Sequence, residues 1–258
     1  MTGRDGHRAQ ANVVGVALLL GVAVVSLGTL TAAVGTVVED HTARTDTARV
    51  ATDLDAALGP VTTTGRNRGR VSFAEGTLRT VERDLRVLDG DGVVERVRVG
   101  ALVYERPGGG RVAFLGGALV SGRGRTASLV TPLPMTASRG SAEGDSEDGD
   151  DGDGGGDAGV LVVGAARLGP TAASVSGGGT VTLRTDVRHH RTDLGTGAYR
   201  VAVETRTPVP LAESFRERGA TVTTRDLDGD GLPSVVASFD GERRAYLVVH
   251  DLSLEVDG

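Results

Sequence analysis

Three aspartates alternate with other residues in the stretch DLDGDGLP, at Asp226, Asp228 and Asp230. Gly231 follows them, so the stretch matches the first half of a calcium loop, D-x-D-x-D-G, in which alternate carboxylates converge on one hard cation. The twelfth position of such a loop supplies a bidentate glutamate, but here it is Ala237. Two interpretations stay open: a weak Ca²⁺ site completed by a distant residue, or an acidic glycine-rich turn between two strands.

Few other residues suggest chemistry. His189 and His190 are adjacent, but no third metal ligand has a suitable spacing, so we expect them in a polar surface loop. The chain has no cysteine, which excludes disulfides, thiolate metal sites and a cysteine nucleophile. It also lacks the G-x-S-x-G, P-loop and H-E-x-x-H motifs. The sequence therefore predicts no catalytic residue, no cofactor beyond the weak Ca²⁺ site, and a protein that is not an enzyme.

Charge is distributed unevenly along the chain. Arg66, Arg68 and Arg70 cluster in GRNRGR, which favours either contact with an acidic glycan or lipid headgroups, or a soluble loop. The net charge is −6, and the segment 143–157 alone carries eight acidic and no basic residues. Because the basic residues are not interleaved with aromatic ones, we expect no nucleic-acid partner.

A long apolar run extends from Val13 to Val38 without a charged residue. As a helix it would span about 39 Å at about 1.5 Å per residue, more than the roughly 30 Å of a hydrocarbon core, so it predicts a membrane helix. Gly21, Gly28 and Gly35 recur every seven residues along one stripe. Such a stripe either allows close helix packing or reflects how common glycine is in membrane helices.

Three interpretations of this run compete. A cleaved secretory signal would have an apolar region of only about 7–15 residues, shorter than this one. A signal anchor is the second, because Arg4 and Arg8 precede the run and Glu39 and Asp40 follow it. The positive-inside rule then predicts a single-pass protein of the cell membrane with a cytoplasmic N-terminus and an extracellular head.

The third interpretation depends on the junction Arg8-Ala9-Gln10, directly before the apolar run. This junction resembles the class III signal peptide of archaeal type IV pilins and archaellins. The run, together with RVSFAEGTLRTVERDLRVL, DLDGDGLPSVVASF and YLVVHDLSLEVDG, resembles a family of haloarchaeal pilin-like proteins. The resemblance implies cleavage by prepilin peptidase between Ala9 and Gln10, with the apolar helix retained. Val14 stands where bacterial pilins carry a glutamate, which leaves open how subunits would align with one another in a filament.

The remaining chain divides at Gly59-Pro60, a strong helix stop. Before it, apolar residues at three- and four-residue spacings predict an amphipathic stalk helix. After it, short runs of alternating apolar and polar residues, separated by glycine-rich turns, predict strands. The composition of the acidic segment 141–159 predicts a disordered loop. The strands include a hairpin at 88–95, and a short helix is expected at 210–219.

Together these observations predict a fold class, a domain organisation and a function. The fold class is α+β, with a long N-terminal transmembrane and stalk helix and a mostly antiparallel β-sandwich-like head. The expected domains are a leader (1–9), a hydrophobic helix and stalk (10–59) and a β-rich head (60–258). The function expected from the resemblance is a pilin-like or minor pilin-like surface subunit, with the membrane, prepilin peptidase and other pilin-like subunits or its own copies as partners. The alternative is a non-polymerising, signal-anchored surface protein with a ligand-binding head.

Overall fold

The computed structural model describes residues 6–59, 61–139 and 159–257, and within α1 it describes no side chain for 6–17 and 30–41. The chain divides into two compact units, Met1–Thr45 and Asp46–Gly258. The expected disordered insert at 141–159 falls, except for Gly159, outside the described residues.

The helix α1 runs from Gly6 to Leu58 over 53 residues. It ends where the sequence predicts a stop, and the Gly59 N–H donates to the Asp55 carbonyl at 2.6 Å. In the last turns, Val50, Leu54 and Leu58 are buried while intervening residues such as Thr52 are exposed. This part of α1 is therefore the amphipathic stretch that the spacing of its apolar residues predicts.

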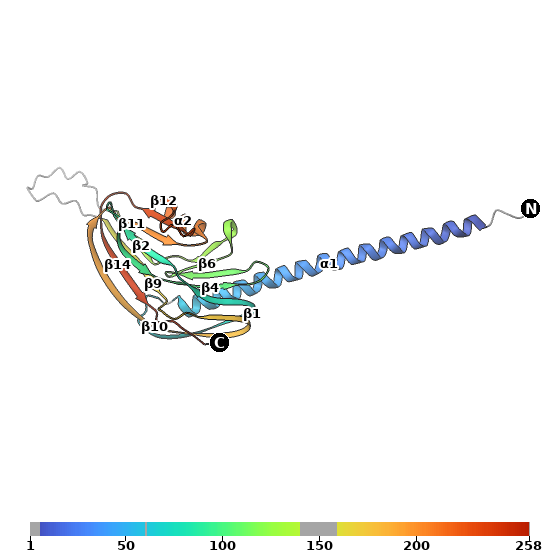
Figure 1. Ribbon diagram of the computed structural model, residues 1–258, viewed down its shortest axis with the longest axis horizontal. Coiled ribbons are helices and arrows are strands. Elements are labelled where there is room, and N and C mark those ends of the chain that lie inside the picture. The colour runs from blue at the N-terminus through green and yellow to red at the C-terminus, as the bar shows by residue number, and fades with distance from the viewer. Residues whose placement is uncertain (1–5, 60, 140–158, 258) are drawn as a thin grey trace, which may run out of the picture. The chain divides into compact units, whose positions relative to one another are not determined.

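The larger sheet has ten strands and carries most of the compact unit (Figure 1). All its pairings are antiparallel except that of β14 with β9, which is parallel. In spatial order its strands are β7 (Ser128–Thr131), β6 (Ala118–Ser121), β5 (Arg111–Leu115), β4 (Ala101–Glu105), β1 (Gly65–Val81), β10 (Ser174–Gly197), β14 (Arg243–Asp251), β9 (Gly159–Arg167) and β8 (Met135–Ala137), with β15 (Glu255–Asp257) also paired to β10.

The smaller sheet has five antiparallel strands. The short helix α2 (Pro208–Glu217) precedes its edge strand and buries Leu211 and Phe215. A 3₁₀ turn, η1 (Gly124–Thr126), lies between β6 and β7 of the larger sheet. The order of the smaller sheet is β12 (Thr221–Asp226), β13 (Pro233–Ser238), β11 (Arg200–Glu204), β2 (Asp84–Leu88) and β3 (Val93–Arg98).

The larger sheet has an apolar core on each of its faces. One core contains residues of both sheets, such as Val163, Val203 and Val235. The other contains the end of α1, strands of the larger sheet and the segment after β14, with Leu54, Val181 and Leu252 as examples. Because successive strand residues point to opposite faces, a run such as Ala165 and Ala166 supplies one residue to each core. The layers are thus the helix end, the larger sheet and the smaller sheet.

Asp46 anchors the helix end to the larger sheet. It is buried, and its carboxylate accepts hydrogen bonds from the Tyr104 hydroxyl at 2.9 Å and the Ala74 N–H at 3.1 Å. Burial, then the hydrogen bond to Asp46, raises the pKa of the Tyr104 hydroxyl above its usual value. Further along the helix, Asn67 donates to the carbonyl of Ala57 at 2.9 Å.

The expected fold class is wrong in two respects. The protein has a β-rich fold rather than an α+β fold, with fifteen strands and two α-helices among the described residues. In the part of the chain whose residues are described, neither helix combines the length and apolarity needed to cross a bilayer. The side chains described within the apolar run, Leu18–Thr29, span only about 18 Å of helix at about 1.5 Å per residue.

Candidate functional site

A charged cluster lies on the face of the smaller sheet that turns away from the core between the two sheets. Strand register produces it: Arg86 on β2 pairs with Ala202 on β11 and with Arg96 on β3. Glu204 follows two residues after Ala202, so its side chain emerges on the same face. Buried Val203 and Leu85, one residue out of phase, point into the core between the sheets.

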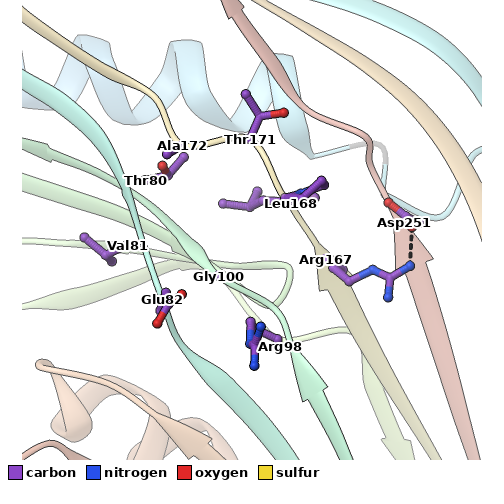
Figure 2. A pocket seen from close by; sticks show the side chains of 12 residues that line it. Thr80, Val81, Glu82, Arg98, Gly100, Arg167, Leu168, Thr171, Ala172 and Asp251 are labelled. Atoms are coloured by element: carbon purple, nitrogen blue, oxygen red, sulfur yellow. Dashed lines mark hydrogen bonds and ion pairs between the residues drawn. The ribbon is translucent and has the colours of Figure 1, made fainter.

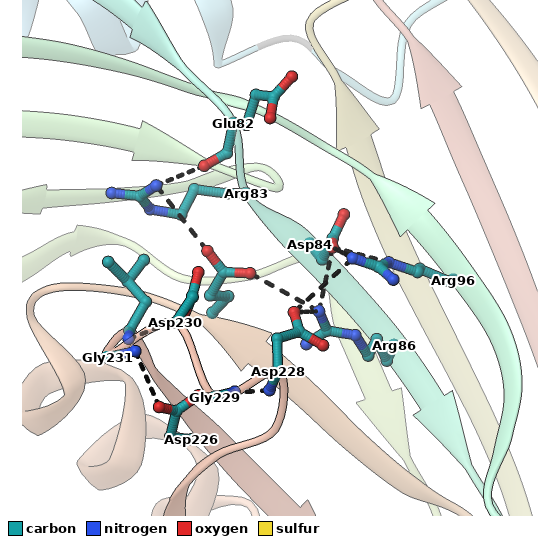
Figure 3. Close-up of polar contacts among 12 residues, drawn as sticks. Glu82, Arg83, Asp84, Arg86, Arg96, Asp226, Asp228, Gly229, Asp230 and Gly231 are labelled. Atoms are coloured by element: carbon teal, nitrogen blue, oxygen red, sulfur yellow. Dashed lines mark hydrogen bonds and ion pairs between the residues drawn. The ribbon is translucent and has the colours of Figure 1, made fainter.

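Arg86 is the centre of this cluster (Figure 3). Its side chain is only 2% exposed. Its Nη2 lies 3.0 Å from Asp84 Oδ2 and 3.7 Å from Glu204 Oε2, and it also contacts the Asp228 carboxylate. Arg96 binds Asp84 from the solvent side. The buried guanidinium of Arg86 thus joins β2, β11 and the loop after β12, and Arg96 links β3 to the same cluster through Asp84.

The predicted calcium loop connects β12 to β13, as the turn interpretation requires. Asp226 accepts backbone N–H bonds from Gly229 at 2.8 Å and Gly231 at 2.9 Å, and these bonds lower the pKa of its carboxyl group. Gly229 and Gly231 have φ of +74° and +81°, which suits glycine. Asp230 accepts the N–H of Leu232 at 2.8 Å.

The loop folds back onto the sheet through two neighbouring residues. Leu227 packs against the small apolar cluster of Leu88, Ala202 and Val236, and Asp228 reaches Arg86. The three predicted metal ligands therefore act differently. Two shape the loop by accepting backbone hydrogens, and Asp228 alone joins other carboxylates.

The carboxylates of Asp84, Glu204 and Asp228 could together hold a cation, because one oxygen from each lies within 4.8 Å of the others. Their surroundings argue against it. Glu204 is buried, and burial raises the pKa of its carboxyl group. Arg83, Arg86 and Arg96 contact the same three carboxylates, with Arg83 Nη1 3.8 Å from Glu204. Three positive charges balance three negative ones, so the cluster is neutral without a metal ion.

His189 and His250 form a polar pair that was not predicted from the sequence. His189 lies in the middle of β10 rather than in a loop, directly opposite His250 on β14. Their Nδ1 atoms are 2.9 Å apart, so one ring donates and the other accepts. Burial, and to a lesser extent the neighbouring His189, lowers the pKa of His250. No sequence signal joins residues 61 positions apart, whereas strand register does.

A pocket of about 590 Å³ lies where the ends of β1 and β9 approach the turn after β3 (Figure 2). Val81, Leu168 and Pro170 give it apolar walls, and Arg98 also lines it. Arg167 also lines it and is paired with Asp251.

The N-terminal apolar run carries a different kind of candidate site. Every described side chain from Leu18 to Thr29 is exposed, and the large apolar ones range from 62% exposed for Val22 to 73% for Leu19. A Cβ added at Gly21 or Gly28 would meet nothing within 4 Å. Ala9, Gln10, Val13, Gly35 and Val38 lie within α1, where the structure describes no side chain for them.

The comparisons with known proteins place the chain in one family. A family of unknown function, DUF7289, matches residues 8–255, and the chain belongs to it. The curated proteins and the solved structures contain no match to the chain. The family gives no activity, so function has to be inferred from the features above.

Proposed function

We propose that the protein is a pilin-like structural subunit, or a minor pilin-like protein, of the cell surface. The N-terminal apolar segment of α1 associates with the same segment of other copies or of related subunits. The β-rich unit that begins at Asp46 then lies outside the cell as the exposed part of the assembly.

The observation that carries this proposal is the uncovered apolar surface of α1. Leu18, Leu19, Leu20, Val22, Val24, Val25 and Leu27 are each at least 62% exposed. An apolar surface of this extent is characteristic of an interaction site, because its burial is favourable by about 25 cal/mol per Å². Small residues at Gly21 and Gly28 allow another helix to approach closely.

The resemblance to archaeal pilins supports the same function from the sequence side. It implies removal of a short basic leader by prepilin peptidase between Ala9 and Gln10. The buried charged cluster around Arg86 fits a structural role, since its carboxylates are neutralised by arginines and none is free to act as a base.

The pocket in Figure 2 favours a second candidate. A cavity of about 590 Å³ falls in the size range of small-molecule sites, which is about 300–1,000 Å³. In this alternative the protein does not polymerise, and its β-rich unit binds a ligand at the cell surface.

The mature N-terminus tests the proposal directly. Mass spectrometry of protein purified from its own cells should find Gln10 as the first residue, and deletion of the prepilin peptidase should restore the leader. A mature chain that starts beyond residue 33 would lack the apolar segment and would overturn the proposal.

Self-association can be tested with substitutions that enlarge side chains on the apolar segment. Gly21→Leu with Gly28→Leu should abolish cross-linked oligomers or filaments seen by electron microscopy, because the new side chains keep helices apart. Leu20→Ile is the matched control, since it preserves volume and apolarity, and it should assemble normally. Equal assembly of both variants, or none by the unaltered chain, would favour the ligand-binding alternative.

A further inference from the structure

Strands β1 and β10 carry an arginine-rich surface, here called the arginine face. Arg66, Arg68 and Arg70 alternate along β1, so their side chains emerge on one side. Directly opposite on β10, Arg184 pairs in register with Arg68, and Asp186 pairs with Arg66. The residues between them point the other way, toward the core that contains the end of α1.

The charges of this face are incompletely balanced. Asp186 lies 3.9 Å from Arg66 and 3.7 Å from Arg188, and Arg184 is paired with Asp257 at 2.9 Å. Among the described residues, neither Arg68 nor Arg70 has a carboxylate partner in an ion pair. Like charges directly opposite each other on antiparallel strands are destabilising, so the Arg68–Arg184 pair favours an added anion.

A hollow of about 540 Å³ lies on the same face. Three arginines and two carboxylates line it, so positive charge is in excess; the charged residues are Arg66, Arg68, Arg184, Asp186 and Glu255. Arginine binds carboxylates with paired, charge-assisted hydrogen bonds, so the chemistry of the hollow suits a carboxylate-bearing chain.

The sequence contains one segment with the complementary chemistry. Residues 143–157 hold eight carboxylates and no basic residue. Three of them, Glu143, Asp145 and Glu147, alternate along the sequence as the arginines of β1 do. Alternate residues of a strand are about 6.6 Å apart, which sets the spacing that a partner with regularly placed carboxylates would match.

Chain length determines which copy supplies this segment. The undescribed stretch 140–158 starts and ends beside β9, since Ser138 donates to the Val160 carbonyl at 2.8 Å. Gly159 pairs with Arg243, which pairs with Gly197 at the far end of β10. The strand between Gly197 and Arg184 is about 43 Å long when measured along β10, which is bent and contains a bulge (Figure 1). A loop of this length with joined ends extends at most about 33 Å, so the comparison favours a segment supplied by a second copy.

We propose that the arginine face binds the acidic segment 143–157 of a second copy of the chain. The contact joins the β-rich units and is separate from the association of α1, so it does not rest on the proposed function.

A peptide titration tests the chemistry of the site. The recipient is the full chain in non-ionic detergent, with every Asp and Glu of 143–157 changed to Asn or Gln. The probe is a fluorescent peptide with the sequence of residues 141–159, followed by anisotropy. Saturable binding is expected at about 50 mM salt and weaker binding at about 500 mM, because salt screens exposed charges.

Two double variants of that recipient locate the binding. Arg68→Glu with Arg70→Glu should lower the affinity at least about tenfold through charge reversal. The matched control, Arg123→Glu with Arg125→Glu, changes two exposed arginines at the same spacing near η1 and should leave the affinity unchanged. Equal loss in both variants, no saturable binding at low salt, or equal binding of a peptide with Asn and Gln in place of its acids would overturn the proposal.

A cross-linking experiment separates one copy from two. The chain has no cysteine, so Ser72→Cys on the arginine face and Ala142→Cys beside the acidic segment introduce the only thiols. Two differently tagged chains, each with one substitution, should form a mixed disulfide on oxidation, and Arg68→Glu with Arg70→Glu should prevent it. A chain with both substitutions that closes only an internal disulfide would overturn binding to a second copy. An acidic polysaccharide that binds the face while the peptide does not would overturn it as well.

Discussion

Arg86 neutralises the carboxylates of the charged cluster on the smaller sheet. It is almost completely buried and contacts Asp84, Glu204 and Asp228. Its Nη1 has no hydrogen-bond partner among the described residues, whereas its Nη2 makes the contacts with all three carboxylates. Removing one partner of a buried ion pair leaves an uncompensated charge in a poorly solvated position.

Arg86→Met is therefore expected to lower the free energy of unfolding by about 3–5 kcal/mol. Arg96→Met is the matched control, because the Arg96 side chain is 54% exposed and solvent screens its ion pairs, so a much smaller loss is expected. Urea denaturation followed by circular dichroism measures the free energy of unfolding of both variants. Similar losses in the two variants would show that burial of Arg86 is unimportant.

Calcium is expected to leave the stability of the protein unchanged. The three carboxylates that could hold it are already neutralised by arginines, whereas a ligand at 100 times its dissociation constant would stabilise the fold by about 2.7 kcal/mol. Thermal melting with millimolar Ca²⁺ and with a chelator compares the two conditions. A clear rise in melting temperature that Asp228→Asn abolishes would instead support the weak Ca²⁺ site.

His250 makes stability depend on pH in a defined direction. Burial lowers the pKa of His250 in the folded protein, so the fold favours the neutral ring. This contribution is fully present above the unfolded pKa of about 6.5 and is lost as the pH falls through the lower folded pKa. His250→Gln should reduce the decline in stability below about pH 6.5, measured by urea denaturation at several pH values. His190→Gln, an exposed neighbour on β10, should leave the decline unchanged.

At the scale of elements, the end of α1 packs tightly against β1 at Gly69. A Cβ on this residue would lie 2.2 Å from the Cβ of Ala57, closer than any real contact. Gly69→Ala is therefore expected to destabilise the protein by about 1–3 kcal/mol, because the helix end must move. Gly90→Ala is the control, since its added Cβ meets nothing within 4 Å. Thermal unfolding distinguishes them, and an unchanged Gly69→Ala variant would mean that the helix end is loosely packed.

Local signals predicted several elements correctly. The Asp-Gly turn at 88–95 joins β2 and β3, the 210–219 pattern corresponds to α2, and the DLDGDGLP stretch connects β12 to β13. Each of these depends on residues that are close in the sequence. In contrast, His189 and His190 were expected in a loop, because the polar residues around them conceal a strand of 24 residues.

The charged cluster and the histidine pair could not be predicted for a related reason. Asp84 and Glu204 come together only through the register of β2 with β11, and Asp228 joins them only because Leu227 folds the loop back. Register depends on packing across the whole sheet, which the sequence of one strand does not reveal. The sequence identified Asp228 for its spacing, but not the arginine that it contacts.

At the scale of the molecule, the compact unit begins at Asp46, within the predicted stalk and before the predicted head at 60–258. Val50, Leu54 and Leu58 belong to one of its two cores. A chain of residues 46–258 is therefore expected to unfold cooperatively within a few degrees of the full chain. A chain of residues 60–258 lacks these core side chains and should lose several kcal/mol, at about 2–5 kcal/mol for each large apolar residue removed. Circular dichroism melting compares the two, and equal stability would show that the helix end adds nothing to the core.

The core that holds the end of α1 also contains Leu252 and Leu254, about two hundred positions later in the chain. During synthesis on the ribosome, the helix end emerges long before these leucines and cannot finish its packing until they arrive. Contacts this distant along the chain slow folding and leave apolar surface uncovered in the nascent polypeptide. This apolar surface therefore stays uncovered until translation of the chain is nearly complete.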